Sequence, residues 1–280
     1  MHIKATCEYI GTRFSGFQAQ NGKRTVQGEL EIACQKFFGT PTKVVGSGRT
    51  DAGVHAVGQV ISFLLPNTYL ESQATKKLVH TPAAGEIFKA TINKDKLLFK
   101  ITTGLNAILP ADISVRELEM RDKFNAREAA KAKTYIYKCY LSKHRSAARD
   151  ATYLQVHQPL DLPSMRLASQ VLTGTNDYTA FCTDVGDKNP TRTIYELELY
   201  DFKLHEPHKN KTFHEDELWF IVRGNGFLKN MVRIIVGVLL DVGTGKLTVA
   251  DVRRILDSRD RKHARETAPA KGLVLFNVEY

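Results

Sequence analysis

The sequence predicts an α+β protein made of two similar halves, and two observations support this. Strand-like alternation of apolar residues occurs near both ends of the chain, at Ile3–Tyr9 and at Gly272–Tyr280. Helical and strand patterns then follow one another in the same order, β-α-β-β-α-β, in residues 1–122 and again in residues 123–280, where an extra helix precedes the last strand. We therefore expect two ferredoxin-like halves whose antiparallel or mixed sheets join, with the helices on the outer face.

In the first half, Thr25 is expected to cap a helix that ends at Gly39, and Pro110 is expected to end a second helix. A long polar stretch at residues 65–96 is expected to be irregular with some helix. The predicted strands and helices of this half are strands at 3–9, 43–45, 57–64 and 113–120, and helices at 26–38 and 98–108.

The second half follows a crossover at residues 123–132. Gly174 is expected to end its first helix, and Thr248 with Asp251 predicts a capping box at its last one. The predicted elements are strands at 133–141, 191–204, 218–223 and 272–280, and helices at 162–172, 227–240 and 248–256.

Length and composition are those of a globular chain: 280 residues with 42% hydrophobic and 25% charged residues. The longest apolar run, residues 234–240, is far shorter than the roughly 20 residues that cross a bilayer. The amino terminus lacks the apolar core of a secretory signal. We expect a soluble cytoplasmic protein without a membrane partner.

Four cysteines lie far apart and form no C-x-x-C pair, so neither a zinc knuckle nor a disulfide scaffold is expected. They are interpreted as small buried apolar residues. The four are Cys7, Cys34, Cys139 and Cys182.

A net charge of +10 favours a polyanionic partner, because cationic side chains bind phosphates and release counterions. A solvated basic surface without such a partner is the alternative. Three basic clusters are candidates for phosphate contact, and the sequence does not choose among them. They are Lys23 with Arg24, Lys143–Arg145 with Arg149, and the run from Arg259 to Arg265.

The Gly-rich segment Gly46–Ala56 is the strongest candidate for chemistry, because glycines allow sharp turns and close ligand approach. A dinucleotide fingerprint fails there, since Asp51 stands where the motif needs glycine or alanine. A P-loop at residues 240–247 fails as well, because leucines occupy its first and last positions. Neither nucleotide-binding motif is therefore present in this form.

Asp51 is the carboxylate of this loop, and Arg49 beside it is expected to lower its pKa and keep it ionised. An ionised aspartate can serve as a nucleophile or general base. It can equally be a turn residue that bonds its own backbone. His55 is interpreted as a structural histidine that fixes the loop through hydrogen bonds. An acid–base hydrolase that uses Asp51 and His55, with or without a metal, is a further hypothesis.

The loop and several collinear blocks between Tyr9 and Leu273 resemble the tRNA pseudouridine synthase A family. The blocks include a glycine- and aromatic-rich opening, a tyrosine-bearing strand and an arginine-bearing helix. The matching positions include Tyr9, Gly11, Phe14, Gly16, Phe17, Gln18, Gln20, Thr25–Gln27, Leu105, Asn106, Phe124–Arg127, Lys133–Tyr137, Arg192–Ile194, Phe227–Arg233, Ile235–Gly237, Ala268–Ala270, Gly272 and Leu273.

The resemblance implies an isomerase that converts uridine to pseudouridine in tRNA, in the anticodon stem-loop at tRNA positions 38–40. It implies that Asp51 is the catalytic aspartate, that Tyr135 stacks on the uracil and can take part in proton transfer, and that Arg233 pairs with Asp51. It further implies that Arg49 helps to flip the target nucleotide and that Leu273 lines the uracil pocket. An active-site cleft between the halves, a homodimer and no cofactor complete the expectation.

Two departures from the family pattern stand out. Asn125 replaces a histidine that many relatives carry, and residues 65–96 form an unusually long segment. Neither touches Asp51, Tyr135 or Arg233, so activity is still expected. A non-catalytic RNA-binding protein on the same scaffold is the alternative.

Overall fold

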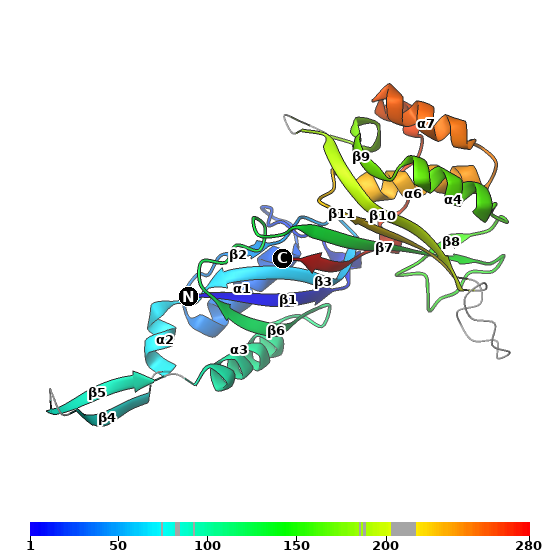
Figure 1. The fold of residues 1–280 in the computed structure, drawn as a ribbon. Coiled ribbons are helices and arrows are strands. Elements are labelled where there is room, and N and C mark those ends of the chain that lie inside the picture. Colours follow the sequence, from blue (N-terminus) through cyan, green and yellow to red (C-terminus); the bar gives the residue numbers. More distant parts are fainter. Residues whose placement is uncertain (74, 82–84, 92, 185, 187–188, 203–216) are drawn as a thin grey trace. The chain divides into compact units, whose positions relative to one another are not determined.

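The α+β class is confirmed by the computed structural model, which describes residues 1–280 except 74, 82–84, 92, 185, 187–188 and 203–216 (Figure 1). The chain forms two compact units. One comprises Met1–Tyr9, Gln18–Gly48 and Gln59–Ala129, and the other Ile10–Phe17, Arg49–Gly58 and Ala130–Tyr280. The predicted division between residues 122 and 123 stays a prediction. Among the described residues, no helix is long and apolar enough to span a membrane.

The first unit contains a mostly antiparallel sheet in the order β6-β1-β3-β2. Strand β3 begins with residues of the second unit and continues into this sheet. The elements are β1 (His2–Tyr9), α1 (Val26–Phe38), β2 (Val44–Gly46), β3 (His55–Leu64), α2 (Asn67–Gln73), β4 (Thr75–Thr81), β5 (Gly85–Thr91), α3 (Lys94–Ile108) and β6 (Ile113–Arg121).

Helix α1 has the start and end that the sequence predicts. The Thr25 hydroxyl accepts a hydrogen bond from the backbone N–H of Gly28 at 3.3 Å, and Gly39 ends the helix in the left-handed conformation. Its apolar face is buried through Val26 and Leu30. Local signals therefore suffice to define this helix.

Residues 65–96 are more regular than predicted. They contain α2 and a hairpin of β4 and β5, and α3 starts at Lys94 because the Asn93 side chain accepts a hydrogen bond from the Lys96 N–H. The hairpin forms a separate two-stranded sheet. Such a ribbon lacks the long one-sided apolar alternation that reveals a strand in a larger sheet.

The second unit contains a sheet in which the start of β3 pairs in parallel with β12, followed by β7, β11, β10 and β9 in antiparallel order. Strand β8 runs parallel to β7. The elements are β7 (Ala132–Leu141), β8 (Leu154–Val156), α4 (Leu162–Val171), β9 (Gly174–Asp177), β10 (Thr191–Asp201), β11 (Glu217–Gly224), α6 (Met231–Gly243), α7 (Val249–Ser258) and β12 (Leu273–Glu279).

One face of this sheet is core. Cross-strand register aligns the buried side chains of Leu199, Phe220, Tyr137 and Leu273 in one row. Helices α4, α6 and α7 pack together, with α4 against β10 and α6 against β7 (Figure 1). The four cysteines are buried as predicted.

Several boundaries differ from the prediction. Helix α6 begins at Met231 rather than at residue 227, because Asn230 adopts a left-handed conformation and interrupts the helical path. Strand β10 ends at Asp201, and the predicted extension to 204 lies partly outside the described residues.

The short strands β8 and β9 were not among the predicted elements. They have three and four residues, too few to show the alternation of apolar residues that predicts a strand. The capping box at Thr248 and Asp251 is confirmed.

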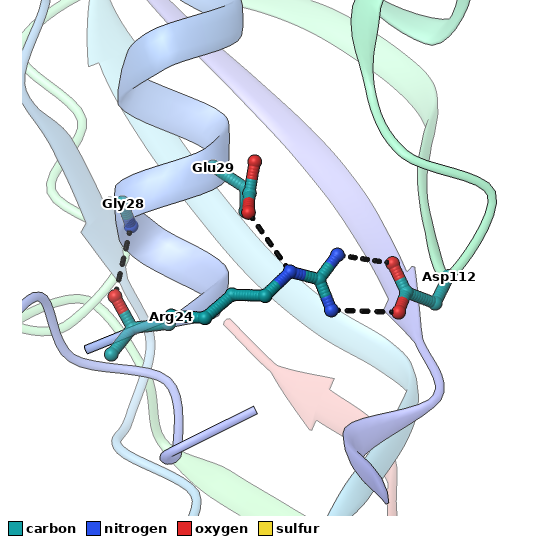
Figure 2. Close-up of polar contacts among 5 residues, drawn as sticks. Arg24, Gly28, Glu29 and Asp112 are labelled. Atoms are coloured by element: carbon teal, nitrogen blue, oxygen red, sulfur yellow. Dashed lines mark hydrogen bonds and ion pairs between the residues drawn. The ribbon is translucent and has the colours of Figure 1, made fainter. Parts of the chain in front are cut away.

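Arg24 joins the start of α1 to the turn after α3 within the first unit (Figure 2). Its two terminal nitrogens each donate to a carboxylate oxygen of Asp112 at 2.9 Å, and its Nε donates to Glu29 at 3.0 Å. The bidentate geometry matches the planar guanidinium to the carboxylate. This guanidinium is therefore engaged in structural contacts, although it belongs to one of the three basic clusters that are candidates for phosphate contact.

Replacing Arg24 with alanine is expected to lower the free energy of unfolding by about 1–3 kcal/mol, because the nearly buried Asp112 carboxylate loses its bidentate partner. Urea denaturation followed by circular dichroism measures the change. Lys23→Ala, at the exposed neighbouring position, serves as the matched control and should change stability by less than about 0.5 kcal/mol. Equal effects of the two variants would contradict the structural assignment of Arg24.

Candidate functional site

The Asp51 loop connects β2 to β3 and rests on the segment Ile10–Phe17. The backbone N–H of Phe17 donates to the Thr50 carbonyl at 3.1 Å, and the N–H of Gly53 donates to the Phe14 carbonyl at 3.4 Å. A side chain at Gly11 would place its Cβ 2.0 Å from the Val54 carbonyl oxygen, so only glycine fits there. The path of the loop is therefore set by backbone contacts with a segment forty residues away in sequence.

The Asp51 carboxyl is partly buried, and its surroundings come from the residues around the start of α6. Burial raises its pKa above the ordinary value. The charge on Arg233, a hydrogen bond from the Asn230 backbone N–H and the charge on Lys229 oppose that rise without cancelling it. The lowering expected from Arg49 is therefore wrong, because desolvation of the carboxylate outweighs the nearby positive charges.

Arg233 lies in the first turn of α6 and is held by two hydrogen bonds. Its Nε donates to the Ala268 carbonyl at 2.7 Å, and its Nη1 donates to Asn230 Oδ1 at 2.8 Å. The segment through Ala268 approaches α6 closely at Gly237, where a Cβ would lie 2.5 Å from the Glu266 carbonyl oxygen. Within the described part of the chain, no ion pair joins Arg233 directly to Asp51, so their interaction acts through space.

Tyr135 belongs to a buried cross-strand row on the core-facing side of β7. Its ring meets the Phe227 ring edge to face, with centroids 5.3 Å apart and planes at 89°. Burial raises the pKa of its hydroxyl, and the negative charge of Asp51 raises it further. The Tyr135 phenol is therefore neutral at physiological pH, and its hydroxyl interacts electrostatically with the Asp51 carboxylate.

The structure brings Asp51, Tyr135 and Arg233 into one compact unit, although Asp51 is far from the other two in sequence. Leu273 belongs to the same unit and is buried. It is the first residue of β12 and pairs with Tyr137 on the neighbouring strand β7. Arg49 is exposed, and no hydrogen bond or ion pair connects its side chain to another described residue. Among the predicted site residues, Arg49 is thus the exposed cation with no described polar partner.

His55 begins β3 and is buried, as a structural residue should be. Its Nδ1 accepts a hydrogen bond from the Gly11 backbone N–H at 3.0 Å, which ties the end of the Asp51 loop to the segment beneath it. The predicted structural role is confirmed. Burial lowers the pKa of its imidazole, the charge of Lys138 lowers it further, and the carbonyls of Lys271 and Ala151 oppose this.

Among the described residues, no cluster of three or more histidine, cysteine, aspartate or glutamate side chains could hold a metal ion.

The basic clusters differ in how many of their cations are already paired. In the cluster at 259–265, Arg259 pairs with Asp177 at 3.3 Å and Arg265 with Asp241 at 3.5 Å. Lys143, His144 and Arg145 are exposed and make no ion pair with a described residue. The cluster at residues 143–145 therefore exposes basic side chains that no described carboxylate already neutralises.

Asn230 contacts the Arg233 guanidinium, and the sequence pattern does not single it out. The stretch around it matched a family block, but a predicted helix start at residue 227 placed Asn230 inside an ordinary helical turn. Its left-handed backbone and its bond to Arg233 depend on tertiary contacts. Phe227 and Ala268 also escaped notice as site neighbours, because the first reads as a helix core residue and the second acts through its backbone carbonyl.

Comparison with known families gives a match to the sequence model described as tRNA pseudouridine synthase, over residues 5–102 and 168–280. The matched ranges contain Asp51, Arg233 and Leu273, whereas Tyr135 falls between them.

Full-length similarity extends to curated bacterial proteins named tRNA pseudouridine synthase A. The protein of Geobacillus sp. (strain WCH70) is 40% identical over 283 residues, covering 99% of this chain and 98% of the relative. That of Bacillus subtilis (strain 168) is 40% identical over 286 residues, covering 100% and 99%. That of Geobacillus kaustophilus is 41% identical over 283 residues, covering 99% and 94%.

The buried imidazole of His55 predicts a pH-dependent stability. Because its folded-state pKa lies below the ordinary 6.5, the unfolded chain binds more protons just below that pH. The free energy of unfolding contributed by His55 is thus fully present above pH 6.5 and is lost as pH falls through the folded-state pKa. Replacement by asparagine, whose side-chain oxygen can accept the Gly11 N–H, is expected to flatten the fall in melting temperature between pH 7.5 and 5.

His263→Asn is the matched control, because His263 is exposed. Thermal unfolding of the wild type and both variants across this pH range measures the effect. A wild-type slope that survives unchanged in His55→Asn would show that other groups cause it.

Proposed function

The chain belongs to the tRNA pseudouridine synthase family and is an isomerase, and from this premise we propose that it converts uridines of the tRNA anticodon stem-loop, at positions 38–40, with Asp51 as its catalytic residue. In this reaction the bond between uracil N1 and ribose C1′ breaks and a bond between C5 and C1′ forms. The C5 proton leaves and N1 gains a proton, so the net change is an isomerisation. The observation that carries the proposal is a partly buried carboxylate that shares one compact unit with Tyr135 and Arg233 and interacts electrostatically with both.

Asp51 is proposed to start the reaction in its ionised form. The carboxylate either attacks C1′ or removes a ribose proton, and either route releases the uracil transiently. The raised pKa supports both routes, because partial desolvation makes the carboxylate a stronger nucleophile and a stronger base than it is in water. Since Arg233 does not occupy the carboxylate directly, its charge can stabilise the ionised form without blocking the reacting oxygens.

Tyr135 is proposed to stack on the uracil and to keep it in the pocket while it rotates, with Leu273 as a further wall. The raised pKa of the Tyr135 hydroxyl limits its part in proton transfer. A neutral phenol can accept the C5 proton only while it gives its own proton to a neighbouring base. Asp51 is the negatively charged group that interacts with the Tyr135 hydroxyl, and we propose that it is the base that takes this proton.

Arg49 is proposed to assist base flipping and to fill the space that the nucleotide leaves. Its exposure and lack of a described partner support this role, since no internal contact must break before it reaches RNA. Flipping costs a few kcal/mol in a stacked helix and less in loosened loop regions. A target uridine near the anticodon loop would therefore cost less to flip than one within a long stacked helix.

The loop with Lys143, His144 and Arg145 is proposed to bind tRNA phosphates. Its base is fixed to β11, where Arg149 approaches the buried Glu217 at 3.4 Å, and Lys271 holds the neighbouring Asp150 at 3.1 Å. An anchored loop presents its charges with less entropy to lose on binding. The net charge of +10 supports a polyanionic substrate.

The finer architecture is part of the same proposal. In each unit the major strands follow the order fourth, first, third, second, namely β6-β1-β3-β2 and β12-β7-β11-β10, which supports two ferredoxin-like halves divided as 1–122 and 123–280. We further propose a cytoplasmic homodimer, on the family resemblance. Light scattering that gives a monomer mass would contradict the dimer.

Asp51→Asn is expected to reduce isomerisation by at least about a thousandfold, because the amide is neither a nucleophile nor a base. The assay measures tritium released from uracil C5 of unmodified tRNA transcribed with tritiated uridine. Binding of the same tRNA, followed by filter retention, should survive the change.

Asp122→Asn provides the control, because Asp122 is an exposed aspartate of the first unit. Full turnover by Asp51→Asn would refute the catalytic assignment. Binding without tritium release by the wild type, on any unmodified tRNA, would point to a non-catalytic RNA-binding protein.

Arg49→Ala is expected to lower kcat/KM on intact tRNA by roughly ten- to a hundredfold, corresponding to about 1–3 kcal/mol of lost help in flipping. The loss should be smaller on a single-stranded oligonucleotide, whose target base is already unstacked. Steady-state tritium release on the two substrates tests this difference, and equal losses on both would contradict a role in flipping.

A further inference from the structure

The loop between β7 and β8 carries basic residues in two different surroundings. Lys143, His144 and Arg145 are exposed at its start, whereas the Arg149 side chain is only 15% exposed. A guanidinium that is mostly removed from water needs partners inside the protein, because it has lost most of its hydration. Arg149 therefore differs from the three cations with which the sequence groups it.

The ionic partner of Arg149 is Glu217, the first residue of β11. The Glu217 side chain is 2% exposed, and its Oε1 lies 3.4 Å from Arg149 Nη2. Its Oε2 accepts a hydrogen bond from the indole N–H of Trp219 at 3.0 Å. The Arg149 guanidinium also lies over the ring of Tyr140, 5.5 Å from its centroid. A buried carboxylate of the sheet thus contacts a cation of the loop.

The main chain around Arg149 is folded into a turn. The Arg149 N–H donates to the Ser146 carbonyl at 3.3 Å, and the N–H groups of Thr152 and Tyr153 donate to the Arg149 carbonyl at 3.1 and 2.9 Å. The Ser146 N–H donates to the Tyr140 hydroxyl at 3.1 Å. Because these bonds converge on Arg149, a contact that fixes its side chain also fixes the turn.

The start of the same loop is closed against β8. The His144 N–H donates to the Ser142 hydroxyl at 3.1 Å, and the Ser142 N–H donates to the Val156 carbonyl at 3.1 Å. Gln155 Nε2 donates to the Ser142 carbonyl at 3.0 Å. The exposed cations at 143–145 therefore lie between two fixed points, β8 on one side and the turn at Arg149 on the other.

We propose that Glu217 is a positioning residue for RNA binding: its buried carboxylate fixes Arg149, and through Arg149 it holds the segment 143–145 in one arrangement before RNA arrives. The inference rests on the proposed function for the identity of the ligand. Cations that are already ordered in the free protein lose less conformational entropy when they meet phosphates. Arg149 itself makes no phosphate contact in this arrangement.

Glu217→Gln tests the effect on the loop, because it keeps the size of the side chain but removes its charge. Arg149 then loses its anionic partner and the turn opens more often. Trypsin cleavage of the native full-length protein within residues 143–149, located by mass spectrometry, should become at least about tenfold faster. Arg149→Gln, which breaks the same pair from the loop side, should give the same acceleration.

Binding of unmodified tRNA, followed by filter retention, shows whether this order matters for the ligand. The dissociation constant should rise roughly tenfold in Glu217→Gln, and the loss should appear in KM rather than in kcat of tritium release. The slope of log Kd against log salt should stay as in the wild type for Glu217→Gln and Arg149→Gln. Lys143→Ala combined with Arg145→Ala should reduce that slope by about two phosphate contacts.

Combining the variants separates positioning from a general loss of stability. In the background of Lys143→Ala and Arg145→Ala, Glu217→Gln should weaken tRNA binding by less than about twofold, because the cations that it positions are absent. A loss of stability alone would weaken binding by the same factor in both backgrounds.

Glu196→Gln is the matched control, because Glu196 also lies 3.4 Å from an arginine, Arg223, but is 51% exposed. It should change neither cleavage nor binding. Unchanged cleavage in Glu217→Gln, an undiminished loss of binding in the combined background, or a reduced salt slope in Arg149→Gln overturns the inference. The expected cleavage and binding results in a protein that releases no tritium would uphold the positioning role and refute the proposed isomerisation.

Discussion

A carboxylate taken partly out of water must be compensated by cations, by backbone donors or by protonation. Asp51 has cations and a backbone N–H near it, and it forms no ion pair with any residue that the structure describes. The Asn230 N–H and the nearby charges of Arg233 and Lys229 oppose the cost of burial. The remaining rise in pKa keeps the group reactive. The other features of the site serve to hold this carboxylate where these compensating groups can act.

The backbone supports this arrangement from two sides. The segment Ile10–Phe17 fixes the loop from below through main-chain hydrogen bonds, and His55 closes the contact by accepting the Gly11 N–H. On the other side, the Ala268 carbonyl and the Asn230 amide fix the guanidinium. Because most of these partners are main-chain atoms, the site depends on where the chain runs more than on which side chains it carries.

Charge is divided between structure and substrate in a way that composition does not reveal. Arg24, Arg259 and Arg265 are paired with carboxylates, while Arg49 and the cluster at residues 143–145 are exposed and make no ion pair with a described residue. Only the unpaired cations can exchange water for phosphate at little cost. The net charge therefore overstates the number of side chains available to RNA.

The sequence by itself determined the elements whose signals are local. The α1 cap at Thr25, the capping box at Thr248, the major strands and the family blocks with Asp51 and Arg233 were all readable, because periodicity and capping involve residues within a few positions of each other. Tertiary structure alone decided the start of α6, the direction of the Asp51 pKa shift and the partners of Arg233. Each of these depends on how deeply a group is buried and on contacts with main-chain atoms of distant segments. Neither can be read from the local sequence pattern, because both arise only when the chain has folded.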